Sequence, residues 1–544
     1  MPAGHFTLKS NIIDPVTRQS GYGVIAIKNG FIESISLTGP LLPDEPYVLP
    51  GFIDAHIHIE SSMLTPPAFA AIAVRHGTVA TVSDPHEIAN VCGVTGVRYM
   101  VELGKQSGFK FYFGAPSCVP ATSFETAGAS LLLSDISELF HDKDAYYLAE
   151  MMNYPAVLTE DPIVMDKIAL AKEHNLPIDG HAPGLKGKDA VKYAAAGITT
   201  DHECTSLDEA HDKLLAGMHI IIREGSAAKN YNALHTLIGS HANNIMLCSD
   251  DKHPDDLLRG HINELVIRSL REGYDLFNVL LTACVNPVKH YKLNVGLLQP
   301  GDPADLIMID DPDSFNILST WINGIQVFGE SKVHLPVIES PVINSFGITS
   351  IDQSGLKLEL QDGIANIIVA IDGSITTGHA KEDMMAGNFE ADVDRDILKI
   401  VVVNRYTAAP PSIALIKGFG LKKGAIASSV AHDSHNIVAV GTNDADLAAC
   451  INEVIYYKGG VAATIGKKHI ILPLPVAGLM STDDAETVGE KYEVVDRFVK
   501  NELGSSLSAP FMTLSFMALL VIPSLKISDL GLFDGAGFNF VDLQ

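Results

Sequence analysis

Two histidines, His56 and His58, lie two residues apart in the stretch GFIDAHIHIE, at the end of an apolar run that is typical of a β-strand. Because side chains alternate between the two faces of a strand, both imidazoles point to the same side. Two nitrogen ligands on one face suit a divalent transition metal. The pair alone also fits two packed or exposed histidines, so a metal site requires further ligands.

Residues able to bind a metal also end four later apolar runs. Glu150 closes AYYLAE, His181 closes LPIDGH, His202 closes GITTDH and Asp250 closes NIMLCSD. Four histidines and two carboxylates gathered in one place would be costly to bury without a cation. The set is large enough for two metals that share a bridging carboxylate. These residues predict a metal site, and their number suits a binuclear one.

Gathering these residues requires a fold in which the ends of many strands meet. Between residues 51 and 286, eight short apolar runs alternate with longer helical patterns, at intervals of roughly 20 to 36 residues. Eight such units predict an α/β fold of the (β/α)8 TIM-barrel type, whose strand ends converge on one mouth. The alternative is an open doubly wound sheet, which would spread these ends along an edge. No glycine-rich phosphate loop follows the first strand to support it.

The segments on either side of the barrel predict two further domains. Short strands closed by Gly or Pro occur in residues 1–50 and again in 287–345, and we expect both pieces to build one composite β-domain. Residues 346–544 have mixed α/β character and predict an additional C-terminal α/β domain. The barrel itself is assigned to residues 51–286.

The composition limits the partners and the compartment. The 38 Lys and Arg against 65 Asp and Glu give a net charge of −27, and no basic patch interrupts it, so neither nucleic acid nor an anionic membrane surface is expected as a partner. The six cysteines are widely spaced without a CxxC pair, and the N-terminus has no apolar signal region, which predicts reduced thiols in a cytoplasmic protein. The apolar stretch 511–525 is too short to span a membrane and predicts buried core.

Other catalytic motifs are incomplete. His58-Ile59-Glu60 has the H-x-E spacing of the zinc cytidine-type deaminases, but no P-C-x-x-C follows it. HEIAN and HECTS lack the second histidine of HExxH. These absences exclude both zinc-enzyme classes.

The order of the motifs resembles the amidohydrolase superfamily. PGFIDAHIHIESS comes first, single histidines end strands five and six, SDD ends strand eight, and GLLQPGDPADLIMID is similar to the segment that closes the composite β-domain. Within the superfamily, the chain is similar to the bacterial-type adenine deaminases over essentially its whole length, including the C-terminal domain. The stretches that carry this similarity are SDPHEIANVCG (83–93), DGHAPGL (179–185), TDHECT (200–205), CSDDKHP (248–254) and VAHDSHNIVAVGTND (430–444).

This resemblance implies hydrolytic deamination of adenine to hypoxanthine and ammonia, a step of purine salvage or adenine catabolism. It also implies a binuclear divalent-metal site that holds manganese or iron, with zinc as a further option. Carried over by position, one metal binds His56, His58 and Asp250, and the second binds His181 and His202. Glu150 would bridge the two metals, in the place where other superfamily members carry a carboxylated lysine.

The implied mechanism needs proton carriers as well as metals. Metal coordination lowers the pKa of a bound water, so that hydroxide can attack C6 of the purine. Asp250 is placed to accept the hydroxide proton and pass it to the departing amine. Glu60, Glu87 and Glu203 are the candidates for the proton donor to N1, and the sequence does not separate them. Glu203 follows His202, so its side chain could instead point at the helices. Glu87 could instead stabilise the N-terminus of a helix through the helix dipole.

Further residues are expected to contact the substrate. Asp84 and His86 follow the second strand and would lie at the barrel mouth, and Asp251 follows Asp250 in the same motif. His432 and His435 belong to the C-terminal domain. They would reach the substrate only if that domain caps the barrel, and would otherwise be surface residues.

Two other functions stay open at this point. The same metal residues would serve another amidohydrolase acting on a different aminoheterocycle or cyclic amide, and barrels of this kind have been reused as non-catalytic assembly proteins. The SDPHE motif and the C-terminal domain favour adenine as the small-molecule substrate, and the complete ligand set argues against an assembly protein. A homo-oligomer, taken as a homodimer, is the expected assembly, although no motif specifies it.

Overall fold

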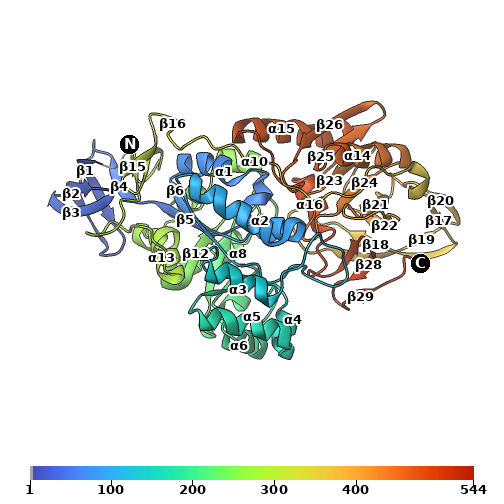
Figure 1. Cartoon of the computed structure of the whole chain (residues 1–544), viewed down its shortest axis with the longest axis horizontal. Coiled ribbons are helices and arrows are strands. Elements are labelled where there is room, and N and C mark those ends of the chain that lie inside the picture. The colour runs from blue at the N-terminus through green and yellow to red at the C-terminus, as the bar shows by residue number, and fades with distance from the viewer. Residues whose placement is uncertain (1–3) are drawn as a thin grey trace.

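Eight strands form a closed ring in the computed structural model, which describes residues 4–544. The ring lies in the middle of the molecule (Figure 1). The strands that pair with a neighbour do so in parallel, and an Ile57–Asp250 bridge joins the first strand to the chain after the last. All eight apolar runs supply a strand, so the predicted barrel is confirmed. The strands are β5 (Phe52–Ile57), β6 (Thr78–Ser83), β7 (Lys110–Phe113), β8 (Leu148–Met151), β9 (Ile178–Gly180), β10 (Thr200–Asp201), β11 (His219–Arg223) and β12 (Ile245–Cys248).

Helices surround the ring of strands because their apolar faces need a partner. Several begin at a side chain that caps the first turn: Asp161 accepts from the Ile163 amide, and Ser206 accepts from the Glu209 amide. The helices are α1 (Pro66–Ala73), α2 (His86–Gln106), α3 (Leu133–His141), α4 (Tyr154–Thr159), α5 (Pro162–Glu173), α6 (Gly187–Ala195), α7 (Leu207–Leu215), α8 (Tyr231–Leu234), α9 (Leu237–Ser240), α10 (Pro254–Arg259), α11 (Ile262–Arg271), α12 (Leu276–Leu280) and α13 (Asn286–Tyr291).

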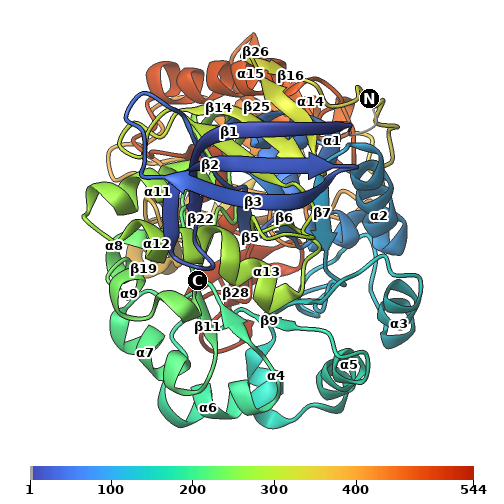
Figure 2. The same cartoon turned by 90° about the vertical axis from the view of Figure 1, so that its left-hand side faces the viewer.

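One sheet joins strands from both sides of the barrel segment. Its order is β16-β15-β14-β13-β4-β1-β2-β3, and the two pieces meet where β13 pairs antiparallel with β4, with Leu306 opposite Pro50. The sheet covers one end of the molecule (Figure 2). Its strands are β1 (His5–Asp14), β2 (Gln19–Lys28), β3 (Phe31–Gly39), β4 (Tyr47–Pro50), β13 (Leu306–Ile309), β14 (Ile317–Ile322), β15 (Ile325–Gly329) and β16 (Lys332–Val333).

The C-terminal part lies at the opposite end of the barrel from this sheet (Figure 1). It contains a second eight-stranded sheet, in the order β19-β18-β22-β21-β24-β23-β25-β26. Alternate residues of β21 (Leu398–Val403) face opposite sides of the sheet. Val401 and Val403 pack with helix α14 (Asp444–Tyr456), whereas Ile400 and Val402 belong to a large apolar cluster that continues into the barrel. Both faces of this sheet are therefore buried at β21, which explains the continuous apolar run of that strand.

The elements of this part include the additional α/β domain that the sequence predicts. The strands are β17 (Leu358–Leu360), β18 (Gly363–Val369), β19 (Gly378–Met384), β20 (Gly387–Phe389), β21 (Leu398–Val403), β22 (Ser412–Lys417), β23 (Ala425–Ser428), β24 (Ile437–Gly441), β25 (Gly460–Ile465), β26 (Lys468–Pro473), β27 (Leu525–Ser528), β28 (Gly531–Asp534) and β29 (Asn539–Phe540). The helices are α14 (Asp444–Tyr456), α15 (Ala485–Phe498) and α16 (Pro510–Phe516).

The apolar stretch 511–525 lies in α16 and the turns after it, and most of it is buried. Across residues 4–544, none of the helices combines the length and the apolar character that crossing a membrane requires. All six cysteines are free and five of them are buried, in agreement with the prediction of reduced thiols.

Candidate metal centre

His56 and His58 project from the end of β5 and bring two ring nitrogens together. Their Nε2 atoms are 3.2 Å apart, and Asp250 Oδ1 lies 3.6 Å from the first and 3.3 Å from the second. The two imidazoles and the carboxylate are almost completely buried. Two imidazole nitrogens that face each other across a carboxylate oxygen fit a shared cation better than a set of hydrogen bonds. This convergence is the feature that fits a metal ion.

Closure of the barrel brings Asp250 to this position. The amide of Asp250 donates to the carbonyl of His56 over 3.0 Å, and the same segment forms the parallel bridge to Ile57. Asp250 has a φ of 54°, a left-handed conformation that is uncommon for a residue other than glycine. The segment after the last strand of the ring thus places its carboxylate against His56 and His58, the candidate ligands of the first strand.

Glu150, at the end of β8, stands between two groups of histidines. Its Oε1 is 3.4 Å from His58 Nε2, while its Oε2 is 2.8 Å from His181 Nδ1 and 3.2 Å from His202 Nε2. Burial raises the pKa of this carboxyl, but His181 and His202 outweigh burial and hold it well below its ordinary value. One oxygen for each group is the arrangement that a bridging ligand requires.

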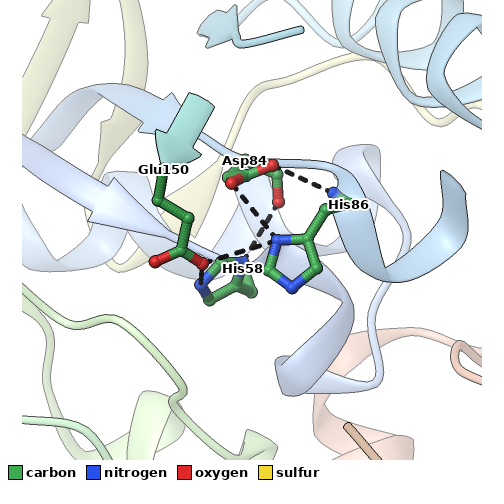
Figure 3. Close-up of side chains that lie close together, drawn as sticks. All are labelled: His58, Asp84, His86 and Glu150. Atoms are coloured by element: carbon green, nitrogen blue, oxygen red, sulfur yellow. Dashed lines mark hydrogen bonds and ion pairs between the residues drawn. The ribbon is translucent and has the colours of Figure 1, made fainter. Parts of the chain in front are cut away.

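Asp84 and His86 border the same centre, as Figure 3 shows. His86 Nδ1 lies 3.2 Å from Asp84 Oδ2 and 3.5 Å from Glu150 Oε1. The carbonyl oxygen of Asp84 is 3.2 Å from His58 Nδ1, so the backbone after β6 orients one of the candidate ligands. Asp84 and His86 therefore lie beside the candidate metal ligands as well as at the mouth of the barrel.

Arg223 is a site residue that reasoning from the sequence missed. It ends β11, donates to both oxygens of Glu203, and donates to Asp250 Oδ2 over 2.6 Å. Burial raises the pKa of Asp250, but the Arg223 guanidinium and His58 outweigh it and hold that pKa well below its ordinary value. Arginine is not a metal ligand, so a search for ligands passes over it. The signal in the sequence is its place near the end of the seventh apolar run, MHIIIRE (218–224), because other runs carry their candidate ligands at this end.

The three candidate proton donors lie in different places. Glu203 lines the cavity, 3.6 Å from His181 Nδ1 and 3.4 Å from His202 Nε2. It does not point at the helices, because β10 ends at Asp201 and the alternation of the strand does not extend to it. Glu87 also lines the cavity. Glu60 is not among the lining residues: it accepts from the Ile88 amide, and burial together with Glu87 raises its pKa to about 7.

The C-terminal domain closes the mouth of the barrel. We call its cavity-lining residues the C-terminal wall: Ile375, His432, Asp433, Phe516 and Leu519. Asp251 lines the cavity from the barrel side, whereas His435 lies behind the cavity and contacts Glu87 Oε2. The cavity that these residues line has a volume of about 30 Å³.

Known proteins match both parts of the chain. Residues 47–327 match the amidohydrolase family, and residues 374–539 match the adenine deaminase C-terminal domain. Three curated relatives named adenine deaminase match over almost the whole chain. The protein of Salinibacter ruber is 50% identical over 100% of this chain and 99% of its own length. Those of Sulfurovum sp. and Methanosarcina mazei are 51% and 49% identical, over 98% of this chain and 99% and 98% of their own lengths. The chain therefore belongs to the amidohydrolase family and, within it, to the adenine deaminases.

Proposed function

We propose that this chain hydrolyses adenine to hypoxanthine and ammonia in the cavity between the barrel mouth and the C-terminal wall. The observation that carries the proposal is the position of Glu150, with one oxygen toward His58 and the other toward His181 and His202. Full-length similarity to adenine deaminases supports adenine as the substrate.

The donor set fits two divalent cations. His56, His58 and Asp250 would hold one, His181 and His202 would hold the other, and Glu150 would join them. Mixed imidazole and carboxylate ligands suit manganese or iron, and zinc is compatible with them. When bound, such cations supply Lewis acidity and lower the pKa of a coordinated water.

Proton transfer is the task of the surrounding side chains. One water proton goes to the departing amine, which leaves as ammonia when its bond to C6 breaks, and the other goes to N1 of hypoxanthine. Asp250 would carry the first proton, because Arg223 holds its carboxylate ionised and in place. Glu203 would carry the second, because it lies beside His181 and His202 within the metal group.

The C-terminal wall would bind the purine. Phe516, Leu519 and Ile375 offer apolar surface to the ring, and Asp433, 3.6 Å from His86 Nε2, offers a polar group to its edge. Such a mixture of apolar lining and a few fixed polar groups is usual in small-molecule sites.

A comparison of substrates tests the proposal. The manganese-loaded chain is incubated with adenine, and separately with dihydroorotate as a cyclic amide, while hypoxanthine, ammonia and ring opening are measured. We expect equal amounts of hypoxanthine and ammonia from adenine and no ring opening. Ring opening of dihydroorotate without ammonia from adenine would overturn the proposal and favour another amidohydrolase activity.

A further inference from the structure

Glu87, Asp251 and His432 form a second group of potential ligands, separate from the six residues above. His432 Nε2 lies 2.7 Å from Glu87 Oε1 and 3.3 Å from Asp251 Oδ1, and the three atoms lie within 4.8 Å of one another. All three residues are less than one-tenth exposed. Two come from the barrel and one from the C-terminal wall, so the group lies at the boundary between the two domains.

The contacts in this group are not hydrogen bonds. Glu87 Oε1 and His432 Nε2 are both buried without a hydrogen-bond partner, although they are only 2.7 Å apart. Polar atoms that converge without hydrogen-bond geometry are costly to bury unless something between them satisfies both.

His432 and Asp251 are also held by partners outside the group, and in Asp251 the held atom is the same Oδ1 that faces His432. Ser515 Oγ donates to the Met512 carbonyl, so it accepts from His432 Nδ1 at 3.1 Å and leaves the lone pair of a neutral His432 on Nε2. Ser61 donates to Asp251 Oδ1 over 2.6 Å. Metal-binding side chains are usually oriented by such hydrogen bonds.

His435 contacts the other oxygen of Glu87 through Nε2, which is also buried without a hydrogen-bond partner. Its Nδ1 accepts from the Ala431 amide at 3.2 Å, so the proton of the neutral ring is on Nε2, which contacts Glu87 Oε2. This contact leaves Glu87 Oε1 directed at His432.

Histidines are the ion-pair partners of the two carboxylates in this group. Glu87 and Asp251 are two buried carboxylates, and no lysine or arginine within residues 4–544 forms an ion pair with either. We propose that Glu87, Asp251 and His432 bind a third divalent cation, in addition to the catalytic pair. Two carboxylate oxygens and one imidazole suit an ion of the manganese or zinc class. The ion would also tie the C-terminal wall to the barrel.

Metal counting tests this site without an activity assay. The full chain is stripped with a chelator and equilibrated with saturating Mn²⁺ alone, and bound manganese per chain is measured by mass spectrometry. We expect three ions in the parent and two in His432→Asn, with Asp251→Asn as a second variant that loses the same ion. His253→Asn is the matched control, because His253 is also buried at the domain boundary but packs on Tyr492, 4.8 Å between rings, and it should keep three ions.

The same experiment separates this site from the catalytic pair. Glu150→Gln should lose ions of the pair while retaining the ion that His432→Asn removes. If the parent binds the same number of ions as His432→Asn and Asp251→Asn, the third site is overturned. This conclusion does not depend on how many ions the catalytic pair binds. A parent that binds fewer than three ions, but still one more than these variants, supports the third site and counts against the pair.

Discussion

Asp250 has two roles in the proposed reaction, as a metal ligand and as the acceptor of a water proton. Its Oδ1 faces His56 and His58, while its Oδ2 accepts from Arg223 over 2.6 Å. Each role therefore uses a different oxygen. The guanidinium beside the second oxygen keeps the carboxylate ionised, which a proton acceptor requires.

Substitution of Asp250 should separate these roles. Asparagine can still offer a carbonyl oxygen to a metal but cannot accept a proton at neutral pH. General acid–base groups contribute about 10² to 10⁴ in rate, so we expect Asp250→Asn to keep much of its metal while kcat falls by at least about 10². His181→Asn is the comparison: it should lose metal first and recover in part when metal is added. Near-parental kcat in Asp250→Asn would show that another side chain accepts the water proton.

Glu125 provides a pH-dependent test away from the metal group. It is buried, accepts from Thr122 Oγ1, and burial together with Asp433 raises its pKa to about 8 from an ordinary 4.5. Between these two values the folded chain binds one more proton than the unfolded chain, so its stability falls as pH rises. Glu125→Gln removes this titration. The melting temperature of the parent should therefore fall relative to Glu125→Gln between about pH 5 and about pH 8.5.

The control for this measurement is Glu490→Gln, at an exposed glutamate of α15. Its melting temperature should differ from that of the parent by the same amount at both pH values. A parent that melts with the same pH dependence as Glu125→Gln would show that Glu125 is ionised in the folded chain at neutral pH.

At the scale of elements, strand β27 connects two segments of the C-terminal wall. Lys526 is fully buried, and its Nζ donates to the carbonyls of Ile375 over 2.8 Å and Phe516 over 2.9 Å. Both of these residues line the cavity. Burial lowers the pKa of Lys526 to about 7. Because Lys526 donates to one carbonyl in each segment, it fixes the distance between the segment of Ile375 and the segment of Phe516.

Loss of these two bonds should loosen the binding of adenine. A hydrogen bond contributes about 0.5 to 1.5 kcal/mol, so two correspond to about a tenfold change in affinity. We expect Lys526→Met to raise KM for adenine about tenfold, with a smaller change in kcat and unchanged metal content. Steady-state kinetics on metal-analysed protein measures this.

Lys399→Met is the matched control for Lys526→Met. Lys399 is also fully buried in the C-terminal domain, where it contacts Asp444 and donates to the Leu356 carbonyl over 2.8 Å, but it does not line or support the cavity. It should lower stability without changing KM. Equal KM values in the two variants would mean that Lys526 has only a structural role.

The elements also show how far the sequence could predict the site. The barrel strands follow from apolar runs at regular intervals, and residues at their ends, such as His181, meet because a barrel brings strand ends together. The direction of Glu203 cannot be predicted from the alternation of side chains along a strand, because β10 has only two residues and ends before it. The contribution of Phe516 could not be predicted, because it depends on how two domains dock rather than on local pattern.

At the scale of the whole molecule, the barrel and the C-terminal domain share one apolar cluster. It includes barrel residues such as Ile57 and Met151 and C-terminal residues such as Ile400 and Phe516. The domain also completes the cavity through the C-terminal wall. Removal of the domain would expose much of this apolar surface to water, at a cost of about 25 cal/mol per Å².

A chain that ends at residue 345 should therefore be insoluble or inactive. The expected result is loss of soluble protein on expression or, where soluble protein is obtained, loss of adenine turnover. Soluble yield and hypoxanthine formation, measured beside the full chain, test this. A soluble truncated chain with full activity would show that residues 346–544 only decorate the barrel.

The most direct test of metal-dependent adenine deamination measures hypoxanthine formation from adenine in chelator-treated protein, before and after Mn²⁺ is returned. The parent should be inactive when stripped and should recover with metal. Glu150→Gln should not recover, because a neutral amide balances the charge of two cations less well than a carboxylate does. Undiminished turnover in the stripped parent, or parental metal content and turnover in Glu150→Gln, would contradict the proposed centre.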